Sequence, residues 1–344
     1  MKGRLIALDH IGDRQAAALM VDGQIDDLIL DGGPQDGPRP GAIYRAIADR
    51  PLKGQGGMML KTPDGSVFLR QAKGMSPGQA LLVQVIARAE PGKAPPVTAK
   101  VLFKSRYAIV TPDAPGLNIS RVIRDDDVRD TLLEVAHEAM QGSTMGLILR
   151  SAAEMAGADD IAEDIAEMRN LAETVLAEAQ GTTPALLFEG DSPHTLAWRE
   201  WTDKAEVRTQ EGSFEDEGVL DAIEALRVPR SALSAGAFMF VEATRALVAV
   251  DVNTGTDTSP AAALKTNLSA ARALPRQLRL RGLGGQITVD FAPLSKNDRR
   301  QIEQALRAAF RTDPVETALV GWTPLGHFEL QRKRERMPLE ACLT

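Results

Sequence analysis

Two short apolar strands that each end in an aspartate constrain the fold of this chain most. Asp251 follows the apolar run in ALVAVDVNTG at 246–255, and Asp290 does so in GQITVDF at 285–291. A basic, helix-like segment lies between them. Strand, helix and strand in this order predict an α/β unit, and a right-handed crossover brings the carboxyl ends of two parallel strands to one edge of a sheet. We therefore expect the two aspartates to lie side by side.

Strand periodicity adds a third polar side chain to this edge. Successive residues of a strand point to opposite faces, so Asp251 and Asn253 share one face while Val250 and Val252 share the other. A carboxylate at the mouth of a buried strand is costly unless its charge is compensated, and two that converge favour a hard divalent cation. The alternative is that each aspartate is an N-cap or turn residue, because Asn-Thr-Gly also suits a plain turn.

The segment between the strands shows helix signals and clustered positive charge. Ser259 is a candidate N-cap with Pro260 at the first helical position, and a GLGG run at 282–285 ends the pattern. The chain as a whole carries a net charge of −7, which argues against a general polyanion binder. The basic residues nevertheless gather in the last third of the chain: Lys265, Arg272, Arg276, Arg279, Arg281, Arg332, Lys333, Arg334 and Arg336. Such a cluster is either a solvated face or a site for phosphates.

Composition places the chain among ordinary globular proteins. With 344 residues and 44% hydrophobic content, it can bury more than one core. No run of about 18 apolar residues exists and the start lacks the apolar core of a signal peptide, so we expect a cytoplasmic protein without a membrane partner. The single cysteine, Cys342, predicts neither an internal disulfide nor a structural zinc. The histidines show no metal-ligand spacing and are predicted to be structural: His10, His137, His194 and His327.

The chain divides into five stretches by pattern. Residues 1–42 read as two or three strands, and 43–106 as short strands with glycine turns, typical of a small barrel of the oligonucleotide-binding type. Residues 107–190 mix strands with acidic helices, and 191–235 are ambiguous with one helix. From residue 236 onward the strand and helix order is that of an α/β unit.

The motifs around the two aspartates resemble, in order, the catalytic core of the ribonuclease E/G family. They are DVNTG at 251–255, KTNL at 265–268, RQLRLRGLGG at 276–285 and VDF at 289–291. Outside this core, TPLGHFELQRKR at 323–334 is similar to the segment before the family's zinc link, and GLILRSA at 146–152 resembles its 5′-sensor motif. The resemblance covers most of the chain, strongly after Gly236 and weakly over 191–235.

The resemblance implies a mixed α/β (α+β) fold of several subdomains. A reduced RNase H-like part would comprise 1–42 plus 191–235. An inserted S1/OB-like barrel would occupy 43–106, and a 5′-sensor-like region 107–190. A DNase I-like α/β catalytic domain would follow over 236–344.

The function that the resemblance implies is magnesium-dependent endonucleolytic cleavage of single-stranded RNA, in RNA processing or decay. Asp251 and Asp290 would ligate Mg²⁺, with Mn²⁺ as an alternative, and Asn253 would orient Asp251 or the scissile phosphate. Metal chemistry agrees, because Mg²⁺ takes one or two carboxylates and activates a bound water. The resemblance also implies that Lys265, Arg276 and Arg279 hold the RNA backbone by charge. Alternatively, the aliphatic stems of Arg276 and Arg279 pack on the sheet.

In the barrel, the resemblance implies RNA contacts at two positions. Phe68 matches one of two family phenylalanines that stack on bases, and the other position is Met59, so one stacking platform is weakened. Lys93 matches an RNA-binding lysine. The alternative for Phe68 is a core residue, and the alternative for Lys93 is an exposed loop residue without a role in binding.

The 5′-sensor is only partly matched. Arg150 and Ser151 correspond to the family's arginine and threonine that hold a 5′-monophosphate. Glu316 stands where the family has a second sensor arginine, and a carboxylate there would repel a phosphate. This predicts a protein that depends less on a 5′-monophosphate than its larger relatives.

Other readings remain open at this stage. The chain stops before the family's cysteine pair, so we expect no zinc-linked tetramer, while a homodimer stays open. A non-catalytic RNA-binding relative would tolerate loss of the aspartates, yet Asp251, Asn253 and Asp290 are all present. A sugar hydrolase could use two carboxylates, but such clefts are rich in aromatics and this chain has 4%.

Overall fold

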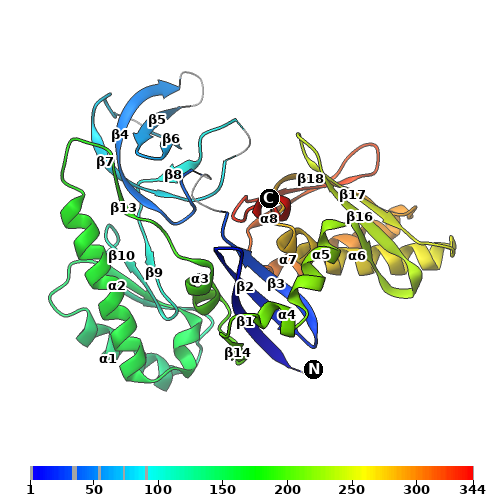
Figure 1. The fold of residues 1–344 in the computed structure, drawn as a ribbon, viewed down its shortest axis with the longest axis horizontal. Coiled ribbons are helices and arrows are strands. Elements are labelled where there is room, and N and C mark those ends of the chain that lie inside the picture. The colour runs from blue at the N-terminus through cyan, green and yellow to red at the C-terminus, as the bar shows by residue number, and fades with distance from the viewer. Residues whose placement is uncertain (1–2, 33–36, 53–55, 73, 90–91, 344) are drawn as a thin grey trace. The chain divides into compact units, whose positions relative to one another are not determined.

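The computed structural model describes residues 3–32, 37–52, 56–72, 74–89 and 92–343 (Figure 1). The chain forms two compact units, each described here by itself. Unit 1 combines Met1–Gln35 with Ala205–Thr344, and unit 2 is Asp36–Lys204. Each unit holds two sheets with helices, which confirms the mixed α/β class. No helix of the described residues is long and apolar enough to cross a membrane.

The first sheet of unit 1 joins the chain's start to a segment from its middle. Its order is β14-β1-β2-β3, with β14 parallel to β1 and the others antiparallel. The strands are β1 (Arg4–Ile11), β2 (Arg14–Val21), β3 (Gln24–Leu30) and β14 (Glu206–Arg208). Helices α4 (Ser213–Asp216) and α5 (Val219–Arg227) bury Phe214 and Ile223 against this sheet.

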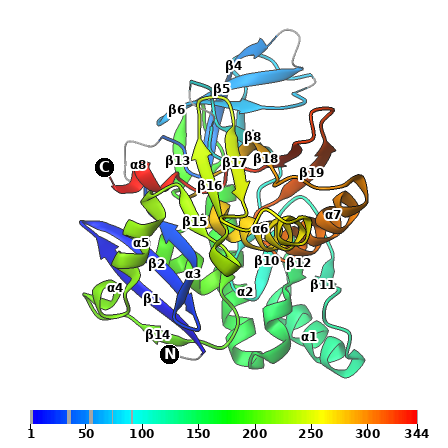
Figure 2. The ribbon, with the colours of Figure 1, turned by 90° about the vertical axis from the view of Figure 1, so that its right-hand side faces the viewer.

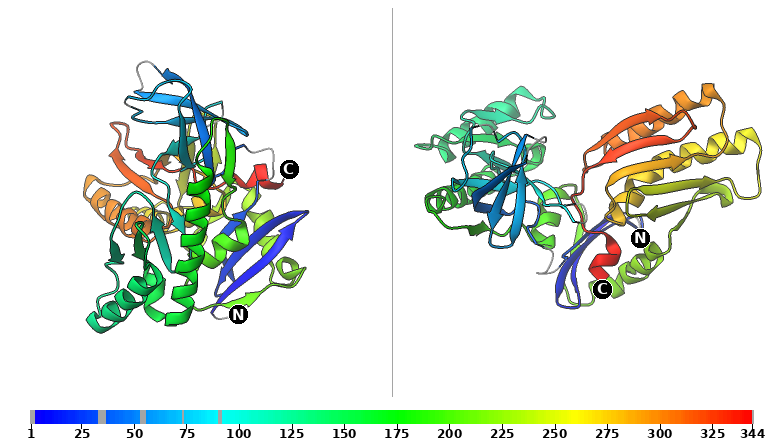
Figure 3. Two further views of the ribbon diagram at one scale, coloured as in Figure 1. Left: turned by 90° about the vertical axis from the view of Figure 1, so that its left-hand side faces the viewer. Right: turned by 90° about the horizontal axis from the view of Figure 1, so that it is seen from above.

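The second sheet of unit 1 is the α/β layer expected near the chain's end. Its order is β15-β16-β17-β18-β20-β19, and β17 and β18 are parallel as predicted. The strands are β15 (Arg230–Ala232), β16 (Phe238–Ala243), β17 (Val248–Asn253), β18 (Gly285–Asp290), β19 (Thr317–Trp322) and β20 (Phe328–Arg332). Two helices, α6 (Pro260–Leu280) and α7 (Lys296–Arg311), pack on one face (Figure 3).

Helix α6 begins and ends where its sequence signals place it. The Ser259 side chain accepts a hydrogen bond from the Ala262 amide and Pro260 opens the helix, as predicted. At the other end Gly282 has φ 63°, and a Cβ there would come within 1.7 Å of the Met337 carbonyl oxygen. A glycine is therefore required where the C-terminal segment, which ends in α8 (Leu339–Leu343), crosses the end of α6.

Buried ion pairs connect the two sheets of unit 1. Arg279 of α6 contacts Asp26 and Asp27 of β3 and also Asp313, which precedes β19. Arg332 Nη2 lies 2.9 Å from Asp313 Oδ1, and these two side chains are 1% and 0% exposed. Arg336 reaches Asp27 from the C-terminal segment. The group contains three arginines and three aspartates, so the formal charges balance inside the protein.

The first part of unit 2 is a closed barrel, as expected for residues 43–106. Its order is β4-β5-β6-β8-β7, and pairing of β7 with β4 closes it. The strands are β4 (Ile43–Leu52), β5 (Gly57–Thr62), β6 (Gly65–Leu69), β7 (Ala80–Val85) and β8 (Pro96–Thr98). Strand β13 (Ala185–Phe188) pairs with the outer edge of β4 (Figure 2). The turn residues at 53–55 lie outside the described residues.

The second part of unit 2 packs helices on a small sheet. Its order is β11-β12-β10-β9, from β9 (Phe103–Lys104), β10 (Ala108–Thr111), β11 (Leu117–Ile119) and β12 (Gly146–Leu149). The helices are α1 (Asp126–Ala139), the 3-10 turn η2 (Ser151–Met155), α2 (Ala158–Glu178) and α3 (Pro193–Glu200). Arg45 of β4 donates to the Glu178 and Gln180 carbonyls at the end of α2.

The stretch 191–235 is divided between the two units. Helix α3 belongs to unit 2, whereas β14, α4 and α5 complete the N-terminal sheet of unit 1. The family resemblance had implied that this whole stretch belongs with 1–42. The assignment of the subdomains to RNase H-like, S1-like, sensor and DNase I-like parts stays a prediction.

We predict that Asp313→Asn destabilises unit 1 by about 3–5 kcal/mol, because it leaves the buried Arg332 and Arg279 without their shared carboxylate. Urea unfolding followed by circular dichroism measures the change. Asp26→Asn is the matched control. Its side chain is 36% exposed and lies 3.5 Å from Arg279, so its loss should cost less than about 1 kcal/mol. Equal effects of the two substitutions would show that the buried network is not what joins the sheets.

Candidate active site

The two predicted aspartates are direct neighbours in the sheet of unit 1. Asp251 of β17 and Asp290 of β18 are paired in register, and Asp290 is the last residue of its strand. Adjacent strands lie ~4.8 Å apart, so the two side chains leave the sheet next to each other. Both aspartates are exposed. The expectation that they lie side by side at one edge is confirmed.

Asn253 is bound to the first aspartate. Its Nδ2 donates a hydrogen bond to Asp251 Oδ2 over 2.8 Å. The shared face predicted from strand alternation is therefore confirmed for this pair. The bond restricts the rotation of the Asp251 carboxylate and leaves its other oxygen for a ligand.

The carboxylates lie on the sheet face opposite the helices. Along β17, Val248, Val250 and Val252 are buried against α6, while Asp251 is exposed on the other side. Strand β18 repeats this pattern, with Ile287 and Val289 buried. The helices thus cover one face and leave the aspartate face accessible within this unit.

Asn267 fixes the backbone immediately after Asp290. Its side chain is completely buried, its Nδ2 donates to the Ala292 carbonyl over 2.9 Å, and its Oδ1 accepts from the Ala292 amide over 3.0 Å. This paired bond attaches the middle of α6 to the end of β18. Sequence reasoning missed this role, although an asparagine at a helix position facing the sheet is a usable signal.

His327 stands beside the second aspartate. Its Nε2 lies 3.8 Å from Asp290 Oδ1, because β20 pairs with β18 and brings His327 to the end of that strand. The sequence predicted a structural histidine. No local signal could have placed it here, since the contact depends on how β20 pairs.

Two aromatic side chains of β16 lie beside Asp251 and Asn253, on the side away from β18. Phe240 and Phe238 of β16 pair with Asp251 and Asn253, and their ring centroids are 5.5 Å apart at 83°. The Arg230 guanidinium lies 4.2 Å from the centre of the Phe238 ring. Both rings are partly exposed. Sequence reasoning did not select them, although FMFV alternates like the neighbouring strand.

The donor set of this edge suits a hard cation. Magnesium is bound through oxygen atoms, commonly one or two carboxylates, and keeps several waters. Two adjacent exposed carboxylates, one of them oriented by an amide, meet that requirement. Among the described residues no group of three or more histidine, cysteine, aspartate or glutamate side chains is arranged to hold a metal. The pair would therefore complete its ion's coordination with water or substrate oxygens.

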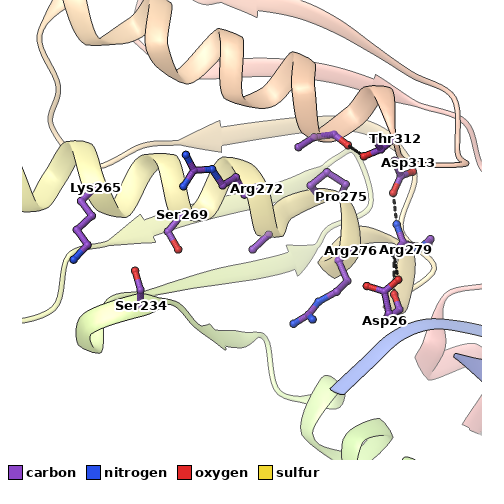
Figure 4. Close-up of a pocket in the computed structure, with 12 residues that line it drawn as sticks. Asp26, Ser234, Lys265, Ser269, Arg272, Pro275, Arg276, Arg279, Thr312 and Asp313 are labelled. Carbon is purple, nitrogen blue, oxygen red and sulfur yellow. Dashed lines mark hydrogen bonds and ion pairs between the residues drawn. The ribbon is translucent and has the colours of Figure 1, made fainter. Parts of the chain in front are cut away.

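The three predicted backbone-binding cations of α6 have different surroundings. Lys265 is exposed and Arg276 is half-buried, with its Nη1 3.3 Å from Gln24 Oε1. Both line a groove beside α6 (Figure 4). Arg279 is 9% exposed and is engaged by aspartates. The structure favours the packing alternative for Arg279.

Arg281, the last arginine of the RQLRLR motif, is also structural. Its Nη2 donates to the Val228 carbonyl over 3.0 Å and to Ser231 Oγ over 3.3 Å. Burial lowers the pKa of the Arg281 guanidinium to about 10, and at neutral pH it stays protonated. It attaches the end of α6 to β15.

In unit 2, Arg150 follows β12 and already has partners. Its Nη1 donates to the Ser105 carbonyl over 2.6 Å, and its Nη2 lies 2.8 Å from Glu200 Oε2 at the end of α3. Burial would raise the pKa of Glu200, but the guanidiniums of Arg199 and Arg150 hold this pKa below its usual value. A carboxylate therefore occupies the anion-binding side of Arg150. The neighbouring Ser151 is exposed at the start of η2.

In the barrel, Phe68 and Met59 are direct cross-strand partners on β6 and β5. Both are partly exposed. A Cβ on Gly57 would come within 2.4 Å of the Phe68 ring, so this glycine lets the ring lie flat across β5. The two positions form one surface patch. Lys93 is exposed in the loop before β8, and Glu316 is exposed before β19 in unit 1.

Comparison with known proteins identifies one group of relatives. The model of the Ribonuclease E/G family matches residues 103–208 and 198–335. Ribonuclease E of Nostoc is 28% identical over 388 residues, covering 96% of this chain and 55% of that protein. Ribonuclease G of Escherichia coli K12 is 30% identical over 307 residues, covering 77% of this chain and 62% of that protein.

A further relative shows a similar level of identity. The Ribonuclease E/G-like protein of Pyropia yezoensis is 26% identical over 311 residues, covering 77% of this chain and 60% of that protein. The chain thus spans less than two thirds of the length of each of these three relatives. The resemblance found in the motifs is confirmed.

Proposed function

Because this chain belongs to the ribonuclease E/G family, we propose that it is a magnesium-dependent endoribonuclease that cleaves single-stranded RNA. The observation that carries this proposal is the in-register pairing of Asp251 with Asp290 on an accessible sheet face. A pair of strand-end carboxylates has little structural use here, since neither makes an ion pair with a described lysine or arginine. Holding a cation beside a phosphate is a function that such a pair can perform.

The residues at this sheet edge would have different roles in the reaction. Asp251 and Asp290 would hold the magnesium ion, which when bound supplies an activated water and neutralises charge developing on the phosphate. Asn253 would keep Asp251 in its ligating orientation through the 2.8 Å bond. Asn267 would keep the end of β18 in place through Ala292.

Neighbouring aromatic rings would position the RNA. Phe240 and Phe238 adjoin Asp251 and Asn253, so a base next to the scissile phosphate could rest on them. On the barrel, Phe68 with Met59 would provide a second contact for bases, and Lys93 a contact for the backbone. Stacking tolerates any base, which suits an enzyme that acts on single strands.

The alternative is a non-catalytic RNA-binding relative. It would use the barrel and the helix cations and would have no need of an oriented carboxylate pair. The hydrogen bond from Asn253 to Asp251 and the clamp from Asn267 favour the enzyme, because they fix atoms at the edge rather than a binding surface elsewhere.

We predict that Asp251→Asn and Asp290→Asn each lower the rate of magnesium-dependent RNA cleavage by at least about 100-fold, because each removes a charged ligand. Asn253→Ala should cost about 10–100-fold, as expected for a residue that orients a ligand. The assay follows cleavage of a labelled A/U-rich single strand with and without magnesium.

Glu242→Gln is the matched control for this assay. Glu242 is exposed on β16 and pairs with Ala249, two positions along β17 from Asp251. Its substitution should leave the rate unchanged. Cleavage that survives both aspartate substitutions would place the chemistry elsewhere, and a wild-type protein without activity would favour the binding alternative.

For the barrel patch, we predict that Phe68→Ala weakens single-strand RNA binding by about 1–3 kcal/mol, the usual worth of one base stack. Met59→Phe should strengthen binding, because it adds a ring beside Phe68. Binding is measured by fluorescence anisotropy without magnesium. If Phe68→Ala unfolds the barrel, Phe68→Tyr keeps a ring and should keep the affinity. Unchanged affinity for a folded Phe68→Ala protein would assign Phe68 to the core.

We further propose weak 5′-monophosphate sensing, since the Glu200 carboxylate already engages Arg150. RNAs with a 5′-monophosphate and a 5′-triphosphate should be cleaved at similar rates by the wild type. Glu200→Gln should raise the preference for the monophosphate, because an amide competes less with phosphate for the guanidinium. A strong monophosphate preference in the wild type would contradict the proposal.

A further inference from the structure

Helix α6 borders a basic groove in unit 1 that lies apart from the aspartate edge. Its volume is about 700 Å³ (Figure 4). Its polar lining consists of four cations, three hydroxyls that include Ser234 and Ser269, and two carboxylates. The cations are Lys265, Arg272, Arg276 and Arg279. We call this pocket the α6 groove. Arg272 belongs neither to the motifs that resemble the family nor to the aspartate site.

Three of its cations form a stripe along one face of the helix. Lys265, Arg272 and Arg276 are separated by seven and four residues, spacings that return to the same side of an α-helix. At 1.5 Å per residue the stripe is ~16 Å long. This length accommodates at least three phosphates of a strand, whose stacked spacing is ~3.4 Å.

No carboxylate among the described residues pairs with the cations of this stripe. The carboxylates in the groove lining are Asp26 and Asp313, and both contact Arg279. No described residue forms an ion pair with Lys265, Arg272 or Arg276, and Arg276 has the neutral Gln24 as its hydrogen-bond partner. Three uncompensated cations in one groove of a chain with net charge −7 mark a site for an anion with several charges.

We propose that the α6 groove binds the phosphate backbone of the single-stranded RNA substrate, outside the cleavage site. This inference rests on the proposed function for the identity of the ligand. The described residues that line the groove include no aromatic side chain, so these residues offer no surface for base stacking. The groove therefore holds RNA by charge and by the Ser234 and Ser269 hydroxyls, without preference for sequence.

The position of the groove along the chain connects it to the aspartate edge. Strand β17 ends at Asn253, α6 starts at Pro260, and Lys265 lies in the second turn of that helix. The Lys265 end of the stripe is thus the end near the carboxylates, and Arg276 is the far end. An RNA strand that leaves Asp251 and Asp290 passes around the sheet edge onto this stripe. The groove then lengthens the contact with substrate beyond the reacting phosphate.

The test measures RNA binding in the absence of cleavage. In an Asp251→Asn background without magnesium, a labelled oligouridylate is titrated at several salt concentrations. The double variant Arg272→Gln with Arg276→Gln should lower the affinity on the order of tenfold at low salt. It should also reduce the slope of log affinity against log salt by ~1.4, because two phosphate contacts are lost. An oligoadenylate should show the same changes.

Arg300→Gln is the matched control, an exposed arginine of α7 that does not line the groove. It should change neither the affinity nor the slope. The single variant Arg272→Glu should also lower the RNA affinity. It tests the groove independently if the double variant misfolds. An unchanged slope in the double variant, or an equal loss in Arg300→Gln, would overturn the proposal.

Two other anions are tested in parallel. If the double variant loses binding to polyglutamate or to phosphatidylserine vesicles but keeps its RNA affinity, the groove serves an acidic protein or a membrane surface and the RNA assignment is wrong. Failure of the catalytic proposal can be distinguished from failure of the groove proposal. A wild type that binds RNA through the groove but never cleaves it would reject the enzyme and retain the groove.

Discussion

The buried ion pairs around Arg279 are the interaction on which the arrangement of unit 1 depends. Arg279 lies between Asp27 of the N-terminal sheet and Asp313 of the α/β layer, and Arg332 and Arg336 complete the pairing. Charges this deeply buried are tolerated because each has a partner of opposite sign within contact distance. Removing one would leave the others unpaired in a medium that solvates them poorly. The network therefore fixes how segments that are distant in sequence meet.

Helix α6 connects this ion-pair network to the aspartate edge. Arg279 and Arg281 hold its C-terminal end, while Asn267 attaches its middle to Ala292, directly after β18. The strand ends are thus anchored from behind the sheet, and the exposed face stays available for a ligand. Chemistry at a phosphate requires ligands held within a fraction of an ångström, and a helix fixed at two points supplies that rigidity. The same helix presents the stripe of the α6 groove.

Local sequence signals predicted the secondary structure around the site well. The N-cap at Ser259, the parallel strands and the alternation that separates Asp251 from Val250 and Val252 all follow from short-range rules and are found. Contacts made across the sheet could not be predicted in this way. His327 reaches Asp290 through the pairing of β20, and Phe240 adjoins Asp251 through that of β16. Such pairings have no signature within either strand alone.

The sequence by itself determined the family, the α/β unit, the closed barrel and the position of two aspartates at one sheet edge. Periodicity and ordered motifs are local properties of the chain, so they can be recognised from the sequence without a three-dimensional structure. The tertiary structure decided which cations are available to a ligand. Arg276 and Arg279 are three residues apart on one helix, yet Arg279 is buried among aspartates and Arg276 lines a groove. The difference arises because the partners of Arg279 come from β3 and from the loop before β19.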